Sequence, residues 1–429
     1  MNNVAKVVEN ELCTGCGTCA GICPANAVKM HVSNGIFLPK IDEEKCTNCG
    51  LCVRCCPGWM VDFEKLNCQI FSSQPKDPLL GNCLTCYVGH SNDIYIRHNS
   101  SSGGIVTQLL IFALEKGIID GALVTKMKQN QPLEPEPFIA RTKEEIISAS
   151  KSKYCPVPAN VALKQILKEN GRFAVVGLPC HIHGIRKAEL LNPELREKIV
   201  LHVSLMCSHM VNFLGTEFIL KKLHVPKGQV SSLSYRGKGW PGAMTIKLKN
   251  SYSFSIPLIG SWDSYWPIFS SFFFTPTRCA LCPDQTGELA DISLGDAWLP
   301  EFRSDKIGES IIITRTKTAE TMLSEMASSK LITLREISPE KVKQSQLLNL
   351  KFKKDDLSTR LNVIKFFGRQ VPQFIPAQSS WSLAAFLRSM YIYFNIKVSS
   401  NRRIMNLLAP LPFPFFRLYF GIYKLLCLI

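Results

Sequence analysis

Cys13-Thr-Gly-Cys-Gly-Thr-Cys-Ala-Gly-Ile-Cys-Pro24 is the stretch that decides the fold of the amino-terminal region, and its cysteine pattern occurs twice. The second copy is Cys46-Thr-Asn-Cys-Gly-Leu-Cys-Val-Arg-Cys-Cys-Pro57. A loop with a cysteine at every third position can wrap three corners of a cubane 4Fe-4S cluster, and in the bacterial two-cluster pattern the fourth cysteine of each run serves the other cluster. The repeat therefore predicts a ferredoxin-like domain with two clusters.

We assign eight cysteines to these two clusters. One cluster takes Cys13, Cys16, Cys19 and Cys56, and the other takes Cys46, Cys49, Cys52 and Cys23. A pair of zinc knuckles is the alternative, but a knuckle uses two cysteines and gives no reason for a proline after the last cysteine of both copies. Cys55 is surplus, and the sequence leaves open whether it is a buried free thiol or an alternative ligand.

The length and composition predict a globular protein with more than one domain. A chain of 429 residues with 46% hydrophobic residues is too long for one ordinary core and too apolar for disorder. We expect no signal peptide ahead of the 18 cysteines, and hence reduced, metal-binding thiols in the cytoplasm. The net charge of +16 is spread along the chain, which argues against nucleic-acid binding and leaves an anionic partner or a membrane surface open.

The pattern along the chain predicts three regions of mixed α+β and α/β class. Residues 1–62 form the ferredoxin domain, and the polar stretch 62–82 predicts a linker. Strand-like and helical patterns alternate in residues 80–345, which predicts an α/β domain. Strands are expected over 119–124, 173–176, 199–205 and 310–314, and a helix is expected over 105–116. Residues 346–429 are expected to form a helical accessory region that is basic and aromatic.

Small residues lead directly into the helix expected over 105–116. They are Ser100-Ser-Ser-Gly-Gly104. Backbone N–H groups at such a helix start, together with the helix dipole, favour a phosphate group. An ordinary serine N-cap is the simpler interpretation of the same residues, and the motif alone leaves both open.

Four further cysteines lie where a third site could form. They are Cys180, Cys207, Cys279 and Cys282. The first two follow expected strands, and the carboxyl ends of strands in open α/β sheets are where ligands bind. The last two form a Cys-x-x-Cys pair, which also suits zinc. Cys83 and Cys86 compete with them for the same role.

The later motifs occur in an ordered series that resembles a known family. They are Ser101-Ser-Gly-Gly104, Ser152-Lys-Tyr154, Gly177-Leu-Pro-Cys180 with Arg186, Arg236 with Gly239-Trp-Pro-Gly242, Cys279-Ala-Leu-Cys-Pro-Asp284, and Ala290-Asp-Ile-Ser-Leu-Gly-Asp296. From residue 1 to about 345 the chain resembles the coenzyme F420 hydrogenase/dehydrogenase beta subunits, in a ferredoxin-first arrangement. The resemblance implies an α/β flavin-binding domain in an iron-sulfur flavoprotein, in which FAD exchanges electrons with clusters and a hydride with coenzyme F420 or another organic substrate.

The resemblance also implies site residues. FAD binding is expected at Ser101, Ser102, Gly103, Gly104, Lys153, Tyr154, Gly177, Pro179 and Arg186. A third 4Fe-4S cluster is expected at Cys180, Cys207, Cys279 and Cys282. No catalytic residue is assigned, because two histidines at a helix start, here His181 and His183, are more often ordinary polar surface residues than proton donors. Asp291 and Asp296 are expected to orient a substrate or a cluster-bearing loop, or to cap a strand end.

The segment 405–429 is rich in aromatic residues and leucines, and it follows Arg402 and Arg403. It predicts either a helix that lies in a membrane interface or a helix that packs on the protein's own core or on a partner. The sequence contains no uninterrupted run of eighteen apolar residues, so a membrane-spanning helix is not expected. The expected location is the cytoplasm, with the inner face of the membrane as the alternative.

These features predict an oxidoreductase that exchanges electrons with a redox partner protein or the ferredoxin pool and acts on a small organic substrate. Coenzyme F420 is one such substrate, but no residue recognises it uniquely. One alternative is an electron-transfer subunit without its own substrate site. Another is a scaffold with a degenerate flavin site, for example in surface-polysaccharide assembly, where relatives of the family also occur. The sequence gives no oligomeric state.

Overall fold

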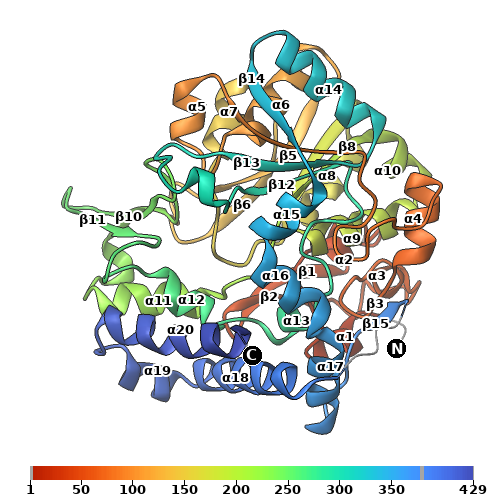
Figure 1. Ribbon diagram of the computed structural model, residues 1–429. Coiled ribbons are helices and arrows are strands. Elements are labelled where there is room, and N and C mark those ends of the chain that lie inside the picture. The colour runs from red at the N-terminus through yellow and green to blue at the C-terminus, as the bar shows by residue number, and fades with distance from the viewer. Residues whose placement is uncertain (1–2, 377–380, 429) are drawn as a thin grey trace.

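The computed structural model describes residues 3–376 and 381–428, and its centre is an eight-stranded mixed sheet with the order β14-β4-β13-β12-β8-β7-β5-β6 (Figure 1). The strands are β4 (Thr85–Ser91), β5 (Gly121–Met127), β6 (Pro135–Ala140), β7 (Phe173–Gly177), β8 (Ile199–Leu205), β12 (Ile292–Asp296), β13 (Ser310–Thr314) and β14 (Ile332–Ile337). β12, β8, β7 and β5 are parallel. Their carboxyl ends therefore meet at one edge, where ligands bind in open α/β sheets.

Helices cover both faces of this sheet. α6 (Ile105–Glu115) and α14 (Lys317–Ser328) pack on one face, and α8 (Leu163–Lys168) and α9 (Pro179–Glu189) pack on the other. In β7, Ala174 belongs to the first core, whereas Phe173 and Val175 belong to the second. Successive strand residues point to opposite faces, so an uninterrupted apolar run is buried on both sides.

The elements expected for the α/β domain are confirmed. The strand expected over 119–124 is observed as β5, and those over 173–176, 199–205 and 310–314 are β7, β8 and β13. The helix expected over 105–116 is α6. Short helices connect the strands, namely α5 (Ile94–His98), α7 (Lys143–Ser148), α10 (Pro193–Lys198) and α15 (Pro339–Ser345).

A second, antiparallel sheet was not predicted from the sequence. It contains β9 (Val230–Ser234), β10 (Ala243–Leu248) and β11 (Ser253–Pro257). This sheet shares an aromatic-rich core with the helices α11 (Phe213–Lys222) and α12 (Trp266–Ser270). The sheet stands out from the left side of the molecule in Figure 1.

The ferredoxin region repeats in structure as well as in sequence. α2 (Thr18–Gly21) and α3 (Leu51–Arg54) each carry the third cysteine of a run, and each begins after a glycine in the left-handed conformation. The two glycines are Gly17, with φ of 83°, and Gly50, with φ of 73°. The remaining elements are α1 (Ala5–Glu9) and the hairpin β1 (Val28–Ser33) and β2 (Ile36–Ile41). Glycine takes this conformation at little cost, which lets each loop turn tightly around its cysteines.

The prediction of a linker over residues 62–82 is wrong for the first half of that segment. β3 (Met60–Asp62) leads into the helix α4 (Phe63–Phe71), and the Asp62 carboxylate accepts a hydrogen bond from the Lys65 amide. Phe63 and Leu66 are buried in the core shared with α8 and α9. The helix therefore joins the two domains, because its apolar residues at helical spacing pack under the central sheet.

The carboxyl-terminal region is helical as expected but is not a separate accessory. Its elements are α16 (Leu347–Leu350), the π-helix η4 (Lys351–Asp355), α17 (Leu357–Phe366), β15 (Gln373–Ile375), α18 (Leu383–Ser400), α19 (Arg402–Leu408) and α20 (Phe413–Leu428). β15 pairs in parallel with β3 of the ferredoxin region. α20 buries Phe416 and Tyr423 in two cores. In the described part of the chain no single helix is long and apolar enough to cross a membrane, although α19 and α20 pass that test together with a bend of 114°.

Candidate redox site

The first set of ferredoxin cysteines lies at the inner side of that domain. Cys16, Cys19 and Cys56 are buried, and Cys13 is half-buried. Burial raises the pKa of the Cys19 thiol well above its usual value, and the neighbouring Cys16, Cys13 and Cys56 raise it further. Grouped thiols whose ionisation is opposed in this way are stabilised as thiolates by a bound cation or cluster.

The second set lies closer to the surface. Cys23, Cys46, Cys49 and Cys52 line one cavity. Cys49 is exposed. Burial raises the pKa of Cys52, and Cys49 and Cys23 raise it further. Cys23 of the first run therefore lies with three cysteines of the second, the exchange of fourth ligands that the repeat predicts.

Cys55 belongs to neither set. It is fully buried in the core under the central sheet. Its thiol donates a hydrogen bond to the Cys52 carbonyl oxygen at 3.5 Å. Of the two roles left open by the sequence, this geometry favours the buried free thiol.

The four cysteines expected to form a third site come together from three parts of the chain. Cys180 lies in the first turn of α9, Cys207 follows β8, and Cys279 and Cys282 lie in and just after α13 (Thr277–Ala280). Burial raises the pKa of Cys180 well above its usual value, followed by the effects of Cys16, Cys279, Cys282 and Cys207. Cys180 therefore lies close enough to the inner ferredoxin set for Cys16 to oppose ionisation of its thiol.

Cys83 and Cys86 do not join this third set. Cys86 is buried in β4, and its sulfur lies 3.4 Å from the Cys83 sulfur. The charged groups around Cys83 are Arg315, Asp77 and Glu320 rather than other cysteine pairs. The Cys-x-x-Cys spacing alone did not distinguish this pair from Cys279 and Cys282.

Two buried cations connect the inner ferredoxin set to the α/β domain. The Lys187 ammonium donates to the carbonyl oxygens of Cys56 and Met60, each at 2.6 Å. The Arg278 guanidinium donates to the carbonyl oxygens of Gly58 and Pro57, each at 2.9 Å. The loop that carries Cys56 is therefore fixed by residues next to the third set. No sequence motif marked either cation.

The serine-glycine loop lies at the carboxyl-end edge of the sheet. The Ser152 amide donates to the Ser101 hydroxyl at 2.7 Å, and the Ser102 hydroxyl donates to the Glu309 carbonyl oxygen at 2.7 Å. Gly104, with φ of 80°, is the N-cap of α6, and no side chain in the described part of the protein caps this helix start. The serine N-cap is therefore not what forms. Gly103 is required by packing, since a Cβ there would lie 2.4 Å from the Gly89 carbonyl oxygen.

Lys153 and Tyr154 lie near this loop, because they directly follow Ser152, which is hydrogen-bonded to Ser101. The Lys153 side chain, however, points away from solvent. Its ammonium donates to the carbonyl oxygens of Ser150 at 2.8 Å and Lys151 at 2.9 Å. Burial lowers the pKa of Lys153 to about 7. Lys151 is the residue that the sequence analysis missed. Burial lowers its pKa, and Lys247 and Lys238 lower it further, so three cations gather beside the loop.

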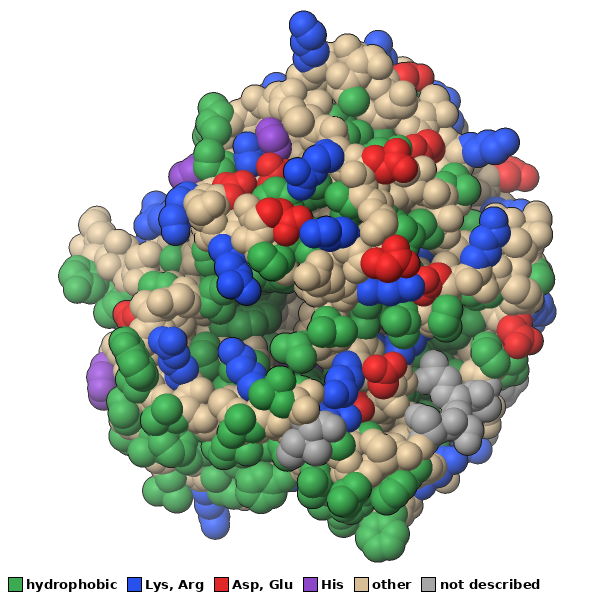
Figure 2. Space-filling model, viewed as in Figure 1, with side chains coloured by type: hydrophobic (Ala, Val, Ile, Leu, Met, Phe, Trp, Pro, Cys, Tyr) green, Lys and Arg blue, Asp and Glu red, His purple; other side chains and the backbone are tan. Residues whose placement is uncertain are grey.

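An ion pair fixes the end of β12 beside this basic group. The Arg236 guanidinium donates two hydrogen bonds of 2.8 Å to the Asp296 carboxylate. The Trp240 indole N–H also donates to Asp296, at 2.9 Å, and the Tyr154 hydroxyl accepts from Arg236 at 3.4 Å. Asp296 thus holds the Gly239-Trp-Pro-Gly242 loop at the sheet edge. Figure 2 shows a hollow on this face, between the three-stranded sheet and α16 as placed in Figure 1.

Gly177 and Pro179 lie at the same edge, but Arg186 does not. Gly177 ends β7 and Pro179 begins α9, which runs back along the sheet. The Arg186 guanidinium donates to Asp291, at 3.2 Å, just before β12 begins. Arg186 is therefore at the opposite end of β12 from Asp296, and the structure does not bring it to the serine-glycine loop. Its charge is compensated there by the buried carboxylates of Asp291 and Glu189.

The two histidines at the start of α9 are buried with structural partners, so the expectation that they lie on the polar surface is wrong. The Leu178 amide donates to His181 Nδ1 at 3.1 Å, and His181 Nε2 lies 3.0 Å from the Val157 carbonyl oxygen. Burial lowers the pKa of His181 to about 4, so its ring is neutral near pH 7. His183 Nε2 lies 2.8 Å from the buried Asp284 carboxylate, next to Cys282. This arrangement orients the Cys282 loop rather than a substrate.

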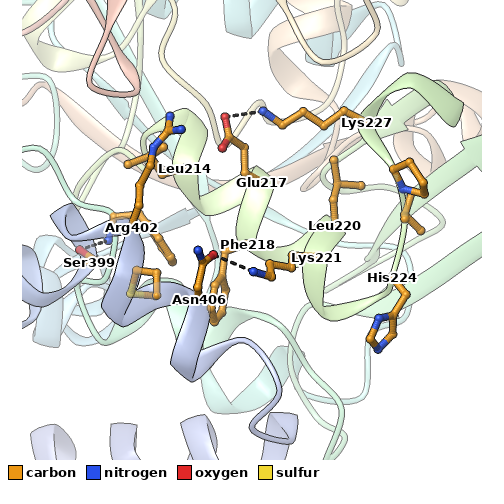
Figure 3. Close-up of a pocket in the computed structure, with 14 residues that line it drawn as sticks. Leu214, Glu217, Phe218, Leu220, Lys221, His224, Lys227, Ser399, Arg402 and Asn406 are labelled. Atoms are coloured by element: carbon orange, nitrogen blue, oxygen red, sulfur yellow. Dashed lines mark hydrogen bonds and ion pairs between the residues drawn. The ribbon is translucent and has the colours of Figure 1, made fainter.

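A separate groove of about 540 Å³ lies between α11 and α19 (Figure 3). Lys227 pairs with Glu217 across it, and Lys221 donates to the Asn406 amide oxygen at 2.7 Å. None of its described lining residues is a cysteine. This groove is therefore distinct from the redox site.

Comparison with known proteins identifies family models along most of the chain. The model described as "4Fe-4S dicluster domain" matches residues 12–58. Two models carry the description "Coenzyme F420 hydrogenase/dehydrogenase, beta subunit"; the one for the amino-terminal part matches residues 86–164, and the one for the carboxyl-terminal part matches residues 170–340. The ferredoxin match decides against zinc knuckles, and the two beta-subunit matches confirm the resemblance.

Individual relatives agree with these models. Coenzyme F420 hydrogenase subunit beta of Methanosarcina barkeri is 28% identical over 294 residues, 63% of this chain and 92% of that protein. The protein of the same name from Methanothermobacter thermautotrophicus is 30% identical and covers 58% of this chain and 82% of that protein. The coenzyme F420-dependent sulfite reductase of Methanocaldococcus jannaschii is 25% identical over 81% of this chain, which spans 50% of that protein.

A solved structure shares the fold. It is a chain of the F420-reducing [NiFe] hydrogenase complex from Methanosarcina barkeri, with 26% identity and a TM-score of 0.52. The match covers 68% of this chain and 94% of that chain. Relatives are therefore subunits of a larger assembly, which implies protein partners for this fold.

Proposed function

Because the chain belongs to the coenzyme F420 hydrogenase/dehydrogenase beta-subunit family, it is an iron-sulfur oxidoreductase, and we propose that it passes electrons between its ferredoxin clusters and FAD at the carboxyl-end edge of the central sheet. Three sites form the proposed route. The outer set reaches the surface at Cys49, the inner set contains Cys16, and the third set contains Cys180 next to Cys16. The packing of α2 against α9, which brings Cys16 close enough to raise the pKa of the Cys180 thiol, carries the proposal.

The third set fits a cluster better than it fits unpaired thiols. Cys180, Cys207 and Cys279 are half-buried, and burial is the first cause that raises the pKa of each. Lys353 of η4 lowers the pKa of Cys207 and Cys279 and donates to the Cys279 carbonyl oxygen at 3.4 Å. A fixed cation next to converging thiols favours their ionised, metal-binding form.

The sheet edge fits an anionic dinucleotide. Two features favour a diphosphate. One is the uncapped start of α6 at Gly104, and the other is the mutual repulsion of three nearby cations, Lys151, Lys238 and Lys247. Arg236 is neutralised by Asp296, so it positions the loop at Trp240 rather than supplying free charge. When bound, FAD supplies the exchange between single electrons and a hydride, and the clusters supply single-electron storage. The residues of the chain itself bind FAD, orient it and exclude water from it.

Anaerobic purification with iron and flavin quantitation tests this proposal. We expect about twelve irons per chain, at four irons per cubane, together with FAD. Cys180→Ala should lower the content to about eight irons and leave the ferredoxin signals in electron paramagnetic resonance spectra. Lys151→Ala should release FAD with iron unchanged, whereas the exposed Lys168→Ala should not. Purified protein that holds eight irons and no FAD would contradict the proposal.

The substrate is proposed as coenzyme F420 or another small organic acceptor, because the relatives described above are named for that coenzyme. An electron-transfer subunit without a substrate site is the second candidate, since the matched structure is part of a multi-subunit complex. Hydride exchange between the flavin-loaded chain and coenzyme F420, followed by absorbance, separates the two. Flavin that is reduced by the clusters but never by the reduced coenzyme would favour the second candidate.

A further inference from the structure

The helix α20 has apolar side chains on two opposite faces. Phe416 and Tyr423 are buried in the protein's own cores. Leu418, Ile422 and Leu425 recur at helical spacing on the other side, and Leu418 is 68% and Leu425 64% exposed. A helix that packs only on its own protein carries polar residues on its outer face. The outer face of α20 is therefore suited to an apolar environment.

α18 and α19 extend this surface, which we call the apolar face. Its exposed side chains are Leu383, Leu387, Phe394, Ile404, Leu407, Leu418, Ile422 and Leu425. Figure 2 shows hydrophobic side chains gathered along the lower edge of the molecule, where Figure 1 places these three helices. Large exposed apolar patches of this kind mark sites of interaction.

The apolar face is held rigidly to the protein. The rings of Tyr391 on α18 and Tyr419 on α20 lie 5.4 Å apart. The Arg388 guanidinium donates to the Leu426 carbonyl oxygen at 2.7 Å and forms a buried ion pair with Asp356. The exposed leucines are therefore not a frayed terminus but part of a packed layer.

The charge of this region identifies what covers the face. From residue 357 to residue 429 the sequence has nine Lys or Arg residues and no Asp or Glu. Arg403, Arg417 and Lys424 are exposed on α19 and α20. A second copy of the chain would bring the same cations against one another, which is unfavourable. A surface of phosphate headgroups supplies the opposite charge together with an apolar layer beneath it.

We propose that the apolar face docks the protein on the surface of a bilayer that contains anionic phospholipid. Leu418, Leu425 and the other apolar side chains enter the boundary of the acyl chains, and Arg403, Arg417 and Lys424 contact the phosphates. Stable peripheral binding requires two such signals, apolar burial and electrostatic attraction. The proposal is for surface docking because α20 buries Phe416 and Tyr423 in the protein's own cores, and because no single helix in the described part of the chain is long and apolar enough to cross a bilayer.

Vesicle flotation of the full-length, anaerobically purified protein tests this proposal. The probes are vesicles of phosphatidylcholine alone and of phosphatidylcholine mixed with phosphatidylglycerol. We expect partition onto the mixed vesicles to be at least about tenfold stronger and to fall with salt. Leu418→Gln with Leu425→Gln should lower it at least about tenfold. Arg417→Gln with Lys424→Gln should remove most of the preference for the anionic lipid.

The matched control is Leu347→Gln with Ile94→Gln, which changes two exposed apolar residues outside the apolar face. This control should bind like the unchanged protein. Iron content reports whether each variant folds, and it also keeps this test separate from the proposed redox function. Variants that keep their iron and lose only vesicle binding support the proposal.

Four results would overturn the proposal. One is equal or absent partition on the two kinds of vesicle, and another is full binding by Leu418→Gln with Leu425→Gln. A third is a dimer that the same substitutions convert to a monomer without any effect on vesicles, since a second copy would then cover the face. The fourth is protein that resists both high salt and alkaline carbonate, because α19 and α20 would then be inserted.

Discussion

At the scale of single residues, Cys83 and Cys86 show how a neighbour sets the chemistry of a thiol. Their sulfur atoms lie 3.4 Å apart. The hydrogen bond from Cys86 is the first cause that lowers the pKa of Cys83 to about 7, while Arg315 also lowers it. The same pairing raises the pKa of Cys86. The pairing therefore favours ionisation of Cys83 over ionisation of Cys86.

We expect the alkylation of Cys83 by iodoacetamide to rise with pH through about 7, because the thiolate is the reacting form. Cys86→Ala removes the hydrogen bond and should move this midpoint up towards about 8.5, the usual thiol value. Mass spectrometry of anaerobically labelled protein measures the midpoint. An unchanged midpoint in Cys86→Ala would mean that Arg315, and not the thiol pair, controls Cys83.

At the scale of elements, the two faces of α20 have different roles: one is buried and stabilises the protein, and the other is exposed and is proposed to dock on a membrane. Phe416 is fully buried and its ring lies 5.7 Å from the ring of Phe218 on α11. Leu418, two residues later, is exposed on the apolar face. The two positions therefore test opposite faces of one helix.

Phe416→Ala should lower the free energy of unfolding by about 3–5 kcal/mol, because it leaves a cavity in the aromatic core. Leu418→Ala should change it by less than about 0.5 kcal/mol, because the side chain is exposed. Denaturant unfolding of the iron-loaded protein, followed by tryptophan fluorescence, measures both. A large loss of stability in Leu418→Ala would show that the outer face of α20 is covered within the protein.

At the scale of the whole molecule, a buried cation joins the ferredoxin cysteines to the third cysteine set. Arg278 is buried beside Cys279 of the third set and donates to the loop that follows Cys56. Burial raises the pKa of Cys13 and Cys279, and Arg278 acts in the opposite direction on both. A permanently charged guanidinium thus lies between two of the three sites.

Arg278→Gln should lower the reduction potential of the inner ferredoxin cluster, because a buried cation stabilises the more negative, reduced state. A shift of about 59 mV corresponds to a tenfold change for a one-electron couple, and we expect a shift of that order. Arg278→Lys, which keeps the charge, should restore most of it. Redox titration followed by electron paramagnetic resonance measures the potentials, and equal potentials for the two variants would contradict an electrostatic role.

The local sequence was sufficient to predict the structure where the contacting residues are close along the chain. The repeated runs from Cys13 to Pro24 and from Cys46 to Pro57 predicted the 4Fe-4S dicluster domain, and they predicted that Cys23 lies with Cys46, Cys49 and Cys52. The strand at 199–205 and the helix at 105–116 were predicted because their apolar residues repeat with the period of the element. The positions of Cys180 and Cys207 followed from the rule that parallel strands end at one edge.

Only the tertiary structure decided which side chains are free to act. It turned Lys153 onto nearby carbonyl oxygens and left Lys151 beside two other cations, and it placed Arg186 at the end of β12 that lies away from the serine-glycine loop. It also made a helix of residues 63–71 and one packed layer of α18 and α20. Spacing in the sequence fixes which residue types recur, whereas the direction, burial and neutralisation of a side chain depend on partners that lie far away in the chain.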